Sequence, residues 1–485
     1  MTPGSTAQWL RTATRNDDWS RVNGTVAGLG LAGFAAADAL LRMGANVTVV
    51  DERRWSDNSE QSERAQILQT LGADVRSGTD VELPDSIDLL IPSPGIPPSH
   101  RLLARDDLRG RTWSGEQLAW QLRPVDNPAP WLVVSGTNGK TTTVEMLAAI
   151  LVASGKHAAA VGNVGRPLVE AMFAEPAYDV LAVELSSFQL HWTHEIHPYA
   201  STLLNVSVDH LDWHGSLENY RFDKARVYNG TTRAVLYNAQ DSVSEQSARE
   251  ADVEEGCVGV GFTLGAPEAG MLGVVDGVLV DRAFVPNRRT HAVPLTSVSD
   301  LVSSSPHNVA NALAAAGLAR SLGAPPSAVK EGLRGFELAG HRQQTIAVVG
   351  GVTYVDDSKA TNVHAADVSL GAFPAVVWIA GGLAKGATFD DVIIRHRDRL
   401  RGVVLIGQDR TLLREALARH APQVPVFEVV DGDTGVMDSA VRAAANMARP
   451  GDTALLAPAC ASMDQFASYQ VRGEAFAESV HRLGQ

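Results

Sequence analysis

Short apolar runs alternate with longer alanine-rich or amphipathic stretches along the chain. Near the N-terminus, the apolar run 26–28 leads into a glycine turn. The alanine-rich stretch 34–43 then predicts a helix, and the run 46–50 predicts a second strand. Strands that alternate with helices in this way are typical of parallel sheets covered by helices. The pattern therefore predicts an α/β fold.

The same alternation begins twice more along the chain. Residues 131–134 predict a strand before a helix at 142–153. The strands of the last series are predicted at residues 352–355, 375–379, 403–406 and 454–456. Prolines cluster between 124 and 130, and a second boundary is expected near 337–341. We predict three domains, which are residues 1–118, 119–338 and 339–485. The polar, glycine-rich stretch 241–300 shows no recognisable chemistry.

Composition narrows the classes of function. The chain has 55 acidic and 41 basic residues and a formal net charge of -14, which disfavours binding to bulk nucleic acid or to an anionic membrane surface. No apolar run approaches the roughly 18 residues that span a bilayer, and residues 1–10 lack the pattern of a secretory signal. The two cysteines, Cys257 and Cys460, fit a reducing compartment. We therefore expect a cytoplasmic protein without membrane insertion.

A glycine turn lies between the first predicted strand and helix. Residues 28–33 read G-x-G-x-x-G, and Asp51 ends the next strand 18 residues after Gly33. Glycines there let a phosphate approach the backbone at a positive helix N-terminus. The turn is compatible with a redox dinucleotide, with a nucleotide that serves as a substrate handle, or with helix packing alone.

A second glycine loop, residues 135–142, lies between strand 131–134 and the next helix. It reads Ser-Gly-Thr-Asn-Gly-Lys-Thr-Thr, so its leading glycine, Gly136, comes two residues later than in the general phosphate-binding loop. Backbone N–H groups would hold phosphate oxygens, Lys140 would reach the outer phosphates, and the Thr141 hydroxyl would bind Mg²⁺. The alternative is a structural turn with an exposed lysine.

Acidic and histidine residues follow two further apolar runs. Glu184 ends the strand predicted from Asp179 onward, where a nucleotide-bound Mg²⁺ needs a hard oxygen ligand. Three histidines recur at every third position, at 191, 194 and 197, but zinc needs convergent ligands, so we expect a surface or interdomain turn. On composition alone, Lys224 reads as a helix lysine that faces water.

These motifs resemble those of the Mur ligases and the related folylpolyglutamate synthetases. The loop 136–142 looks like their shortened phosphate loop, and residues 184–190, 205–212 and 356–362 look like the D-glutamate-adding branch of the Mur ligases. The resemblance covers almost the whole chain. It implies a Rossmann-like N-terminal domain, a central P-loop ATPase-like parallel sheet and a Rossmann-like C-terminal domain. It also implies a monomeric ATP-dependent ligase that adds D-glutamate to UDP-N-acetylmuramoyl-L-alanine through an acyl phosphate, in peptidoglycan precursor synthesis.

The resemblance further implies which residues form the sites. ATP would be bound by Gly136, Thr137, Asn138, Gly139, Lys140, Thr141, Thr142, Asn308, Asn311, Arg342 and Asp357. The UDP substrate would be bound by Gly30, Leu31, Ala32, Asp51, Arg53, Ser93, Gly95, Asn163 and Ser186. D-Glutamate would be bound by Thr361, Lys385, Ser462 and Tyr469. Two Mg²⁺ would be held by Thr141, Glu184, His210 and Lys224, with Lys224 carbamylated. The implied catalytic residues are Lys140, His210, Lys224, Arg342 and Lys359.

Three other functions stay open on the sequence. A folylpolyglutamate synthetase would run the same reaction on a folate, but it normally lacks the turn at residues 28–33. A nicotinamide-dependent oxidoreductase would use Gly28 and Asp51. A non-catalytic nucleotide-binding regulator would leave Glu184, His210 and Arg342 without a role. Cys460 lies in a turn without an evident base, and a small buried residue is the better reading.

Overall fold

The computed structural model describes residues 8–56, 59–108, 110–337, 340–429 and 435–484. The chain forms two compact units. The first unit comprises residues 1–206 and 218–337, and the second comprises residues 207–217 and 338–485. The short segment 207–217 thus belongs with the C-terminal residues, although it lies within the predicted central domain. The predicted boundary between residues 338 and 339 falls outside the described residues.

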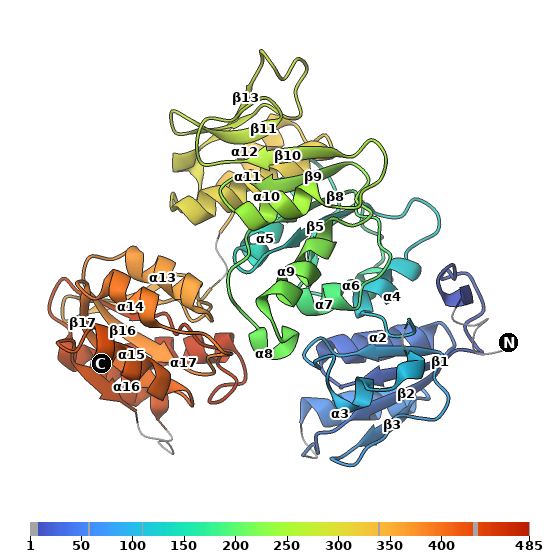
Figure 1. The fold of residues 1–485 in the computed structure, drawn as a ribbon, viewed down its shortest axis with the longest axis horizontal. Coiled ribbons are helices and arrows are strands. Elements are labelled where there is room, and N and C mark those ends of the chain that lie inside the picture. The colour runs from blue at the N-terminus through green and yellow to red at the C-terminus, as the bar shows by residue number, and fades with distance from the viewer. Residues whose placement is uncertain (1–7, 57–58, 109, 338–339, 430–434, 485) are drawn as a thin grey trace. The chain divides into compact units, whose positions relative to one another are not determined.

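The first unit begins with a four-stranded parallel sheet in the order β3-β2-β1-β4 (Figure 1). Its strands are β1 (Asn23–Ala27), β2 (Asn46–Asp51), β3 (Asp74–Ser77) and β4 (Leu89–Pro92). Its helices are α2 (Leu31–Arg42), α3 (Glu60–Thr70) and α4 (Gly115–Gln121). Helix α2 is alanine-rich and packs on β1 and β2, so the predicted strand–turn–helix–strand series is present.

The larger sheet of the first unit has nine strands in the order β13-β12-β11-β10-β9-β8-β5-β7-β6. Its strands are β5 (Trp131–Ser135), β6 (Ala158–Gly162), β7 (Val180–Glu184), β8 (Ala200–Leu203), β9 (Ala234–Asn238), β10 (Val258–Phe262), β11 (Met271–Val275), β12 (Val278–Asp281) and β13 (Val293–Ser297). Only the pairs at the β11–β12–β13 edge are antiparallel. The stretch 241–300 therefore supplies mainly the outer strands of this sheet.

Helices cover the nine-stranded sheet. They are α5 (Lys140–Ala153), α6 (Leu168–Ala171), α7 (Ser187–His191), α9 (Leu217–Ala225), α10 (Ser242–Arg249), α11 (Pro306–Ser321) and α12 (Pro326–Arg334). Helix α5 packs against α11, α12 and β7. Because it is enclosed by these elements, seven of its residues are buried, among them Leu147 and Ile150. The first turn of α5 is thereby held on a rigid core.

The second unit is built on a six-stranded sheet in the order β14-β15-β19-β16-β17-β18, parallel except for β14 against β15. Its strands are β14 (Gln344–Val349), β15 (Val352–Asp356), β16 (Val376–Gly381), β17 (Leu400–Ile406), β18 (Val426–Glu428) and β19 (Thr453–Leu456). Its helices are α8 (Leu211–His214), α13 (Val363–Gly371), α14 (Asp390–His396), α15 (Arg410–His420), α16 (Val436–Met447) and α17 (Tyr469–Leu483). The predicted α/β class with three parallel-dominated sheets is confirmed. Among the described residues, no helix combines the length and the apolar character needed to cross a bilayer.

Candidate functional site

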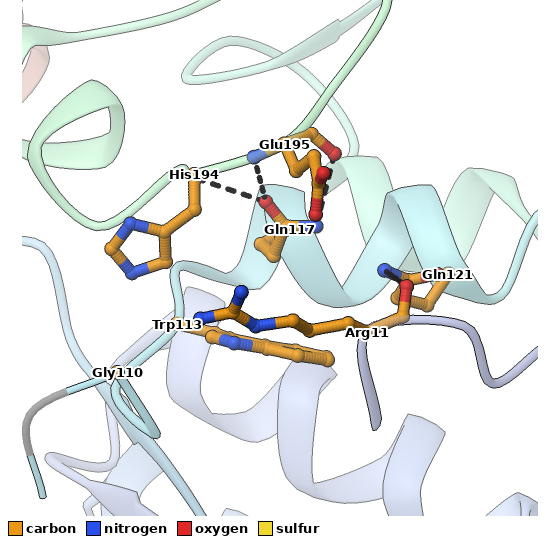
Figure 2. A pocket seen from close by; sticks show the side chains of 7 residues that line it. All are labelled: Arg11, Gly110, Trp113, Gln117, Gln121, His194 and Glu195. Carbon is orange, nitrogen blue, oxygen red and sulfur yellow. Dashed lines mark hydrogen bonds between the residues drawn. The ribbon is translucent and has the colours of Figure 1, made fainter. Parts of the chain in front are cut away.

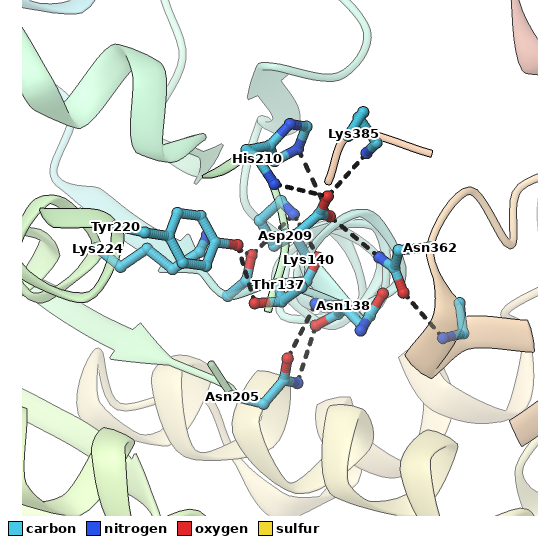
Figure 3. Close-up of polar contacts among 12 residues, drawn as sticks. Thr137, Asn138, Lys140, Asn205, Asp209, His210, Tyr220, Lys224, Asn362 and Lys385 are labelled. Atoms are coloured by element: carbon cyan, nitrogen blue, oxygen red, sulfur yellow. Dashed lines mark hydrogen bonds and ion pairs between the residues drawn. The ribbon is translucent and has the colours of Figure 1, made fainter. Parts of the chain in front are cut away.

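The phosphate-type loop joins β5 to α5 in the first unit. Gly139 precedes α5 with a φ of 85°, and a Cβ on it would lie 2.4 Å from Oδ1 of Asn311. Asn205 follows β8, the neighbour of β5, and contacts the loop through its side chain. Its Oδ1 accepts from the Asn138 N–H at 2.9 Å, and its Nδ2 donates to the Asn138 carbonyl at 3.1 Å (Figure 3). The Thr137 N–H donates to the Asn205 carbonyl at 2.9 Å. The loop is therefore preformed, and Asn205, which the sequence prediction did not include, helps to shape it.

Two lysines converge on the loop. Nζ of Lys140 donates to the carbonyl oxygens of Gly136 at 2.8 Å and Thr137 at 3.0 Å. Nζ of Lys224, on α9, donates to the same Gly136 oxygen at 2.8 Å and lies 4.9 Å from the Tyr220 ring centroid. Only 2% of Lys224 is exposed, so the composition-based reading of a lysine facing water is wrong. Packing against the loop overrides the polar pattern of the helix.

Glu184 ends β7 beside β5, since Val134 and Glu184 are register partners in the parallel pair. Its Oε1 accepts from Nδ2 of Asn163 at 2.9 Å. Its Oε2 is buried and has no hydrogen-bond partner among the described residues. A buried carboxylate oxygen without a partner is costly unless a cation or donor occupies the space before it.

The oxygens around the loop fit a magnesium ion that is held mainly by nucleotide and water. Thr141 lies in the first turn of α5, and Glu184 supplies a hard carboxylate oxygen. Among the described residues, no three His, Cys, Asp or Glu side chains lie together as a metal cluster. Magnesium commonly keeps waters and substrate phosphates as ligands and takes only one or two protein carboxylates, so the sparse protein set is compatible with it.

The remaining ATP-side residues are divided between the units. Asn308 and Asn311 lie on α11 in the first unit, where Nδ2 of Asn308 donates to the Ser303 carbonyl at 2.7 Å. Arg342 and Asp357 belong to the second unit, together with His210 of the predicted metal set. Burial raises the pKa of Asp357 to about 6, against the lowering effect of its hydrogen bond from Ser369 and of the Arg342 charge.

The first glycine turn allows α2 to pack closely and leaves open space at the N-terminus of that helix. A Cβ on Gly33 would lie 2.0 Å from the Gly28 carbonyl oxygen, so this glycine is needed for α2 to approach the turn. Gly30 caps α2 with open space beside it, and Leu31 is 51% exposed, whereas Ala32 is partly buried. The turn therefore places the N-terminus of α2, where an anion is favoured, beside open space at Gly30.

Asp51 uses both carboxylate oxygens within the turn. Oδ2 accepts from the Leu29 N–H at 2.7 Å, and the Arg53 guanidinium contacts both oxygens. Burial by itself raises the Asp51 pKa, but these hydrogen bonds outweigh it and the pKa is lowered. Ser93 donates to the Gly28 carbonyl at 3.0 Å, and Gly95 is exposed, with open space where a Cβ would lie. The structure therefore gathers the predicted UDP-side residues of the small sheet around one turn.

A buried carboxyl group on helix α4 supports α7. Ser186 caps α7 in a reciprocal capping box with Gln189. Nε2 of Gln189 donates to Oε1 of Glu116 at 2.6 Å. Glu116 is 6% exposed, and burial raises its pKa to about 7. Sequence analysis missed Glu116, since nothing in its local pattern separates it from a surface glutamate in a first helical turn.

The three histidines at 191, 194 and 197 go to separate partners. Nδ1 of His191 lies 2.9 Å from Oδ2 of Asp223, and Nε2 of His194 lies 2.9 Å from the Thr112 carbonyl. His197 contacts Glu254. Each histidine thus makes a local structural contact within the first unit.

The first unit also has a cavity of about 260 Å³ away from the predicted residues. It is lined by Arg11, Gly110, Trp113, Gln117, Gln121, His194 and Glu195 (Figure 2). The Arg11 side chain extends along the Trp113 ring, and Gln117 accepts from the N–H groups of His194 and Glu195. These contacts connect α4 to the larger sheet.

In the second unit, predicted residues gather at the carboxyl ends of β15, β16 and β19. The segment after β15 carries Lys359, whose Nζ lies 5.1 Å from the ring centroid of Tyr469, and Thr361 follows within the same turn. Ser462 comes after β19 and is 4% exposed. In parallel sheets this edge is where ligands bind. Cys460 is fully buried, and burial raises its pKa to about 12, which confirms its reading as a small buried residue.

The segment 207–217 contributes an acidic residue to this edge. Oδ1 of Asp209 lies 2.8 Å from Nζ of Lys385, and Oδ2 accepts from Nδ2 of Asn362 at 3.2 Å (Figure 3). The next residue, His210, has a φ of 53°, and its Nε2 lies 3.6 Å from Oδ2 of Asp209. Asp209 therefore connects His210 to the predicted D-glutamate residue Lys385.

Comparison with known proteins agrees with this geometry. The Mur ligase middle domain matches residues 134–319, and the glutamate ligase domain of Mur ligases matches residues 341–460. A Streptomyces avermitilis protein named UDP-N-acetylmuramoylalanine–D-glutamate ligase is 54% identical, covering 96% of this chain and 99% of its own. The protein of the same name from Thermobifida fusca is 52% identical, covering 94% and 98%.

Solved structures share the fold at low identity. A pseudomurein peptide ligase type C from Methanothermus fervidus aligns with a TM-score of 0.56 at 18% identity, over 96% of this chain and 100% of its own. The UDP-N-acetylmuramate–alanine ligase of Thermotoga maritima aligns with a TM-score of 0.54 at 18% identity, over 95% and 99%. With the full-length relatives and both matched domains, these findings show that the chain belongs to the Mur ligase family.

Proposed function

We propose that the chain is an ATP-dependent ligase that adds D-glutamate to UDP-N-acetylmuramoyl-L-alanine in peptidoglycan precursor synthesis. The observation that carries the proposal is 54% identity to a ligase of that name over 99% of its length. The preformed phosphate loop and the polar edge of the six-stranded sheet supply the two kinds of site that such a reaction needs.

In the first step, a carboxylate oxygen of the UDP substrate attacks the γ-phosphorus of ATP, ADP leaves, and an acyl phosphate forms. The obstacle is the approach of one anion to another. A cation at about 4 Å offsets roughly 4 kcal/mol of that repulsion in a partly dry site. Lys140 and Arg342 are the proposed cations. Lys140 can exchange its two carbonyl acceptors in the loop for phosphate oxygens, which leaves the loop backbone in place.

Glu184, Thr141 and His210 are the proposed protein ligands of two Mg²⁺, together with a carbamate on Lys224. When bound, Mg²⁺ neutralises phosphate charge. Oε2 of Glu184, which has no hydrogen-bond partner in the described part of the chain, supports this role. The carbamate would form when the neutral Lys224 amine bonds to the carbon of CO₂ and releases a proton. The buried amine shares the Gly136 carbonyl with Lys140, and loss of the positive charge on Lys224 would remove the repulsion between the two cations, which supports the modification.

In the second step, the D-glutamate amine attacks the acyl carbon, and phosphate leaves from a tetrahedral intermediate. Lys385, Thr361 and Ser462 are proposed to bind the two carboxylates of D-glutamate, and the Tyr469 ring is proposed to form a wall of the pocket. Lys385 has three N–H donors, so it can bind a substrate carboxylate while it keeps its contact with Asp209. Lys359 is proposed to stabilise the phosphate that develops nearby. We further propose that the enzyme acts as a monomer in the cytoplasm.

Phosphate release from ATP tests the proposal directly. The assay contains UDP-N-acetylmuramoyl-L-alanine and compares D-glutamate with L-lysine, L-alanine and diaminopimelate. We expect release only with D-glutamate. Release with diaminopimelate or L-lysine would refute the specificity, whereas tight NADH binding without ATP turnover would refute the ligase proposal altogether.

A further inference from the structure

A buried arginine joins the segments that carry the proposed amino-acid site. Arg472 lies on α17, one turn after Tyr469, and is 1% exposed. Its Nε donates to Oγ of Ser358 at 2.9 Å, and its Nη2 donates to the Ser358 carbonyl at 2.8 Å. Its Nη1 donates to the Cys460 carbonyl at 3.1 Å. Ser358 in turn donates from Oγ to the Tyr469 carbonyl at 2.8 Å.

These bonds connect three separate parts of the chain. Ser358 directly precedes Lys359 in the segment after β15. Cys460 lies two residues before Ser462 in the segment after β19, and Tyr469 begins α17. One guanidinium thus sets the mutual positions of backbone segments that carry three proposed site residues, Lys359, Ser462 and Tyr469. A shift of about 1 Å in such positions can lower the rate of a reaction roughly 100-fold.

Burying the charged Arg472 side chain costs more free energy than burying an apolar side chain of similar size. Among the described residues, no carboxylate forms an ion pair with it, and all three of its hydrogen-bond acceptors are neutral oxygens. Burial lowers the Arg472 pKa to about 10, although Asp464 and Asp356 at longer range favour the charged form. An apolar side chain would serve packing alone at lower cost, so the cation has a use beyond packing.

We propose that Arg472 is a positioning residue for the amino-acid substrate. It holds the segments around Lys359, Ser462 and Tyr469 in position, and its buried positive charge favours the binding of the two carboxylates of D-glutamate at these segments. This inference rests on the proposed function. It predicts that loss of Arg472 weakens use of D-glutamate selectively.

The test compares Arg472→Met, which removes charge and hydrogen bonds, with Arg472→Lys, which keeps the charge. Steady-state KM and kcat are measured for D-glutamate, ATP and the UDP substrate. We expect Arg472→Met to raise the KM for D-glutamate about 100-fold, with the other two KM values within about threefold. Arg472→Lys should raise it less, and Ser358→Ala should show the same selective pattern without any change of charge.

Phe476→Leu is the matched control, because Phe476 is a fully buried residue one turn further along α17. It should lower the melting temperature but leave the KM for D-glutamate within about threefold of wild type. Equal increases in all three KM values, or the same rise in the KM for D-glutamate in Phe476→Leu, would contradict the positioning role. Arg472 would then contribute only to the stability of the fold. If Arg472→Met does not fold, the KM values of Arg472→Lys and Ser358→Ala test the proposal instead. A wild-type enzyme that ignores D-glutamate would instead refute the proposed function, before any variant is compared.

Discussion

Lys140 and Lys224 donate to one shared acceptor, the Gly136 carbonyl oxygen, from 2.8 Å each. The two nitrogen atoms therefore lie no more than about 5.6 Å apart. Two unit charges at that distance repel by about 3 kcal/mol at an effective dielectric constant of 20. Before nucleotide binds, the loop thus concentrates positive charge that phosphate oxygens, or a carbamate on Lys224, would relieve.

Loss of the Lys224 amine should remove activity in a way that an anion can restore. Lys224→Ala should be inactive and partly rescued by short carboxylic acids, because they can replace the carbamate oxygens. Lys224→Arg should be inactive and resist rescue, since its side chain fills the space. Phosphate release is the measurement, and Lys330→Ala on α12 is a control for loss of an exposed lysine. An active Lys224→Ala without additives would rule out the carbamate.

Lys140→Ala should abolish ATP turnover without unfolding the protein. Its ammonium contacts two loop carbonyls that water can satisfy after truncation, so the melting temperature should change little. The loss of phosphate contacts should lower kcat by about 100-fold or more. Turnover within about threefold of wild type would show that the loop does not bind the transferred phosphate.

Glu184→Gln should raise the Mg²⁺ concentration that gives half-maximal rate by at least about tenfold, because an amide oxygen is a weaker ligand than a carboxylate. Titration of phosphate release with MgCl₂ measures this. Asp281→Asn is the control, since Asp281 is a fully buried carboxylate of the same sheet, paired with Arg320 instead. If both variants shift the Mg²⁺ requirement equally, Glu184 acts through stability and not as a ligand.

The amino-acid site should require both carboxylates of D-glutamate. D-Alanine leaves one set of buried donors unpaired, and such mismatches cost factors of roughly 10⁴ in kcat/KM. L-Glutamate should fail on handedness. Lys385→Ala should lower kcat/KM for D-glutamate far more than it changes binding of the UDP substrate. Competition kinetics with the three amino acids check the first two outcomes, and efficient use of D-alanine would contradict the proposed pocket.

The buried carboxyl group of Glu116 predicts a pH dependence of stability. Burial raises the Glu116 pKa from 4.5 to about 7, so the folded state binds more protons than the unfolded state between these values. The contribution of Glu116 to stability is fully present below pH 4.5 and is lost as the pH rises through about 7. The shift corresponds to at most about 3 kcal/mol.

Glu116→Gln should reveal that loss, because Gln stays neutral and still accepts from Gln189. Its free energy of unfolding should match wild type at pH 4.5 and exceed it by up to about 3 kcal/mol at pH 8. Urea unfolding of both proteins across this pH range gives the difference between their free energies of unfolding. The contributions of the other titrating groups are the same in both proteins and cancel in this difference. A difference that does not change with pH would mean that Glu116 titrates normally.

Local signals in the sequence were sufficient for the fold class and for the glycine loop between β5 and α5. Buried parallel strands such as β5 and β16 are continuous apolar runs, and the loop 136–139 depends on two glycines three residues apart, so both are visible without tertiary contacts. The outer strands β10 to β13 were not recognised. They are short and partly exposed, and their apolar pattern is therefore weak.

Only the tertiary structure revealed the contacts between residues far apart in sequence. Lys224 reads as a surface lysine until α9 packs against the phosphate loop 88 residues away. The Lys385–Asp209 pair spans 176 residues, and the bonds of Arg472 reach Ser358 across 114 residues. Burial, ion pairing and proton affinity depend on what surrounds a side chain, and those surroundings come from the packing of distant segments. The sequence by itself therefore determined the α/β class of the protein and the position of its glycine loop, whereas the fold decided which charges are buried and which contacts hold the segments of the proposed site in place.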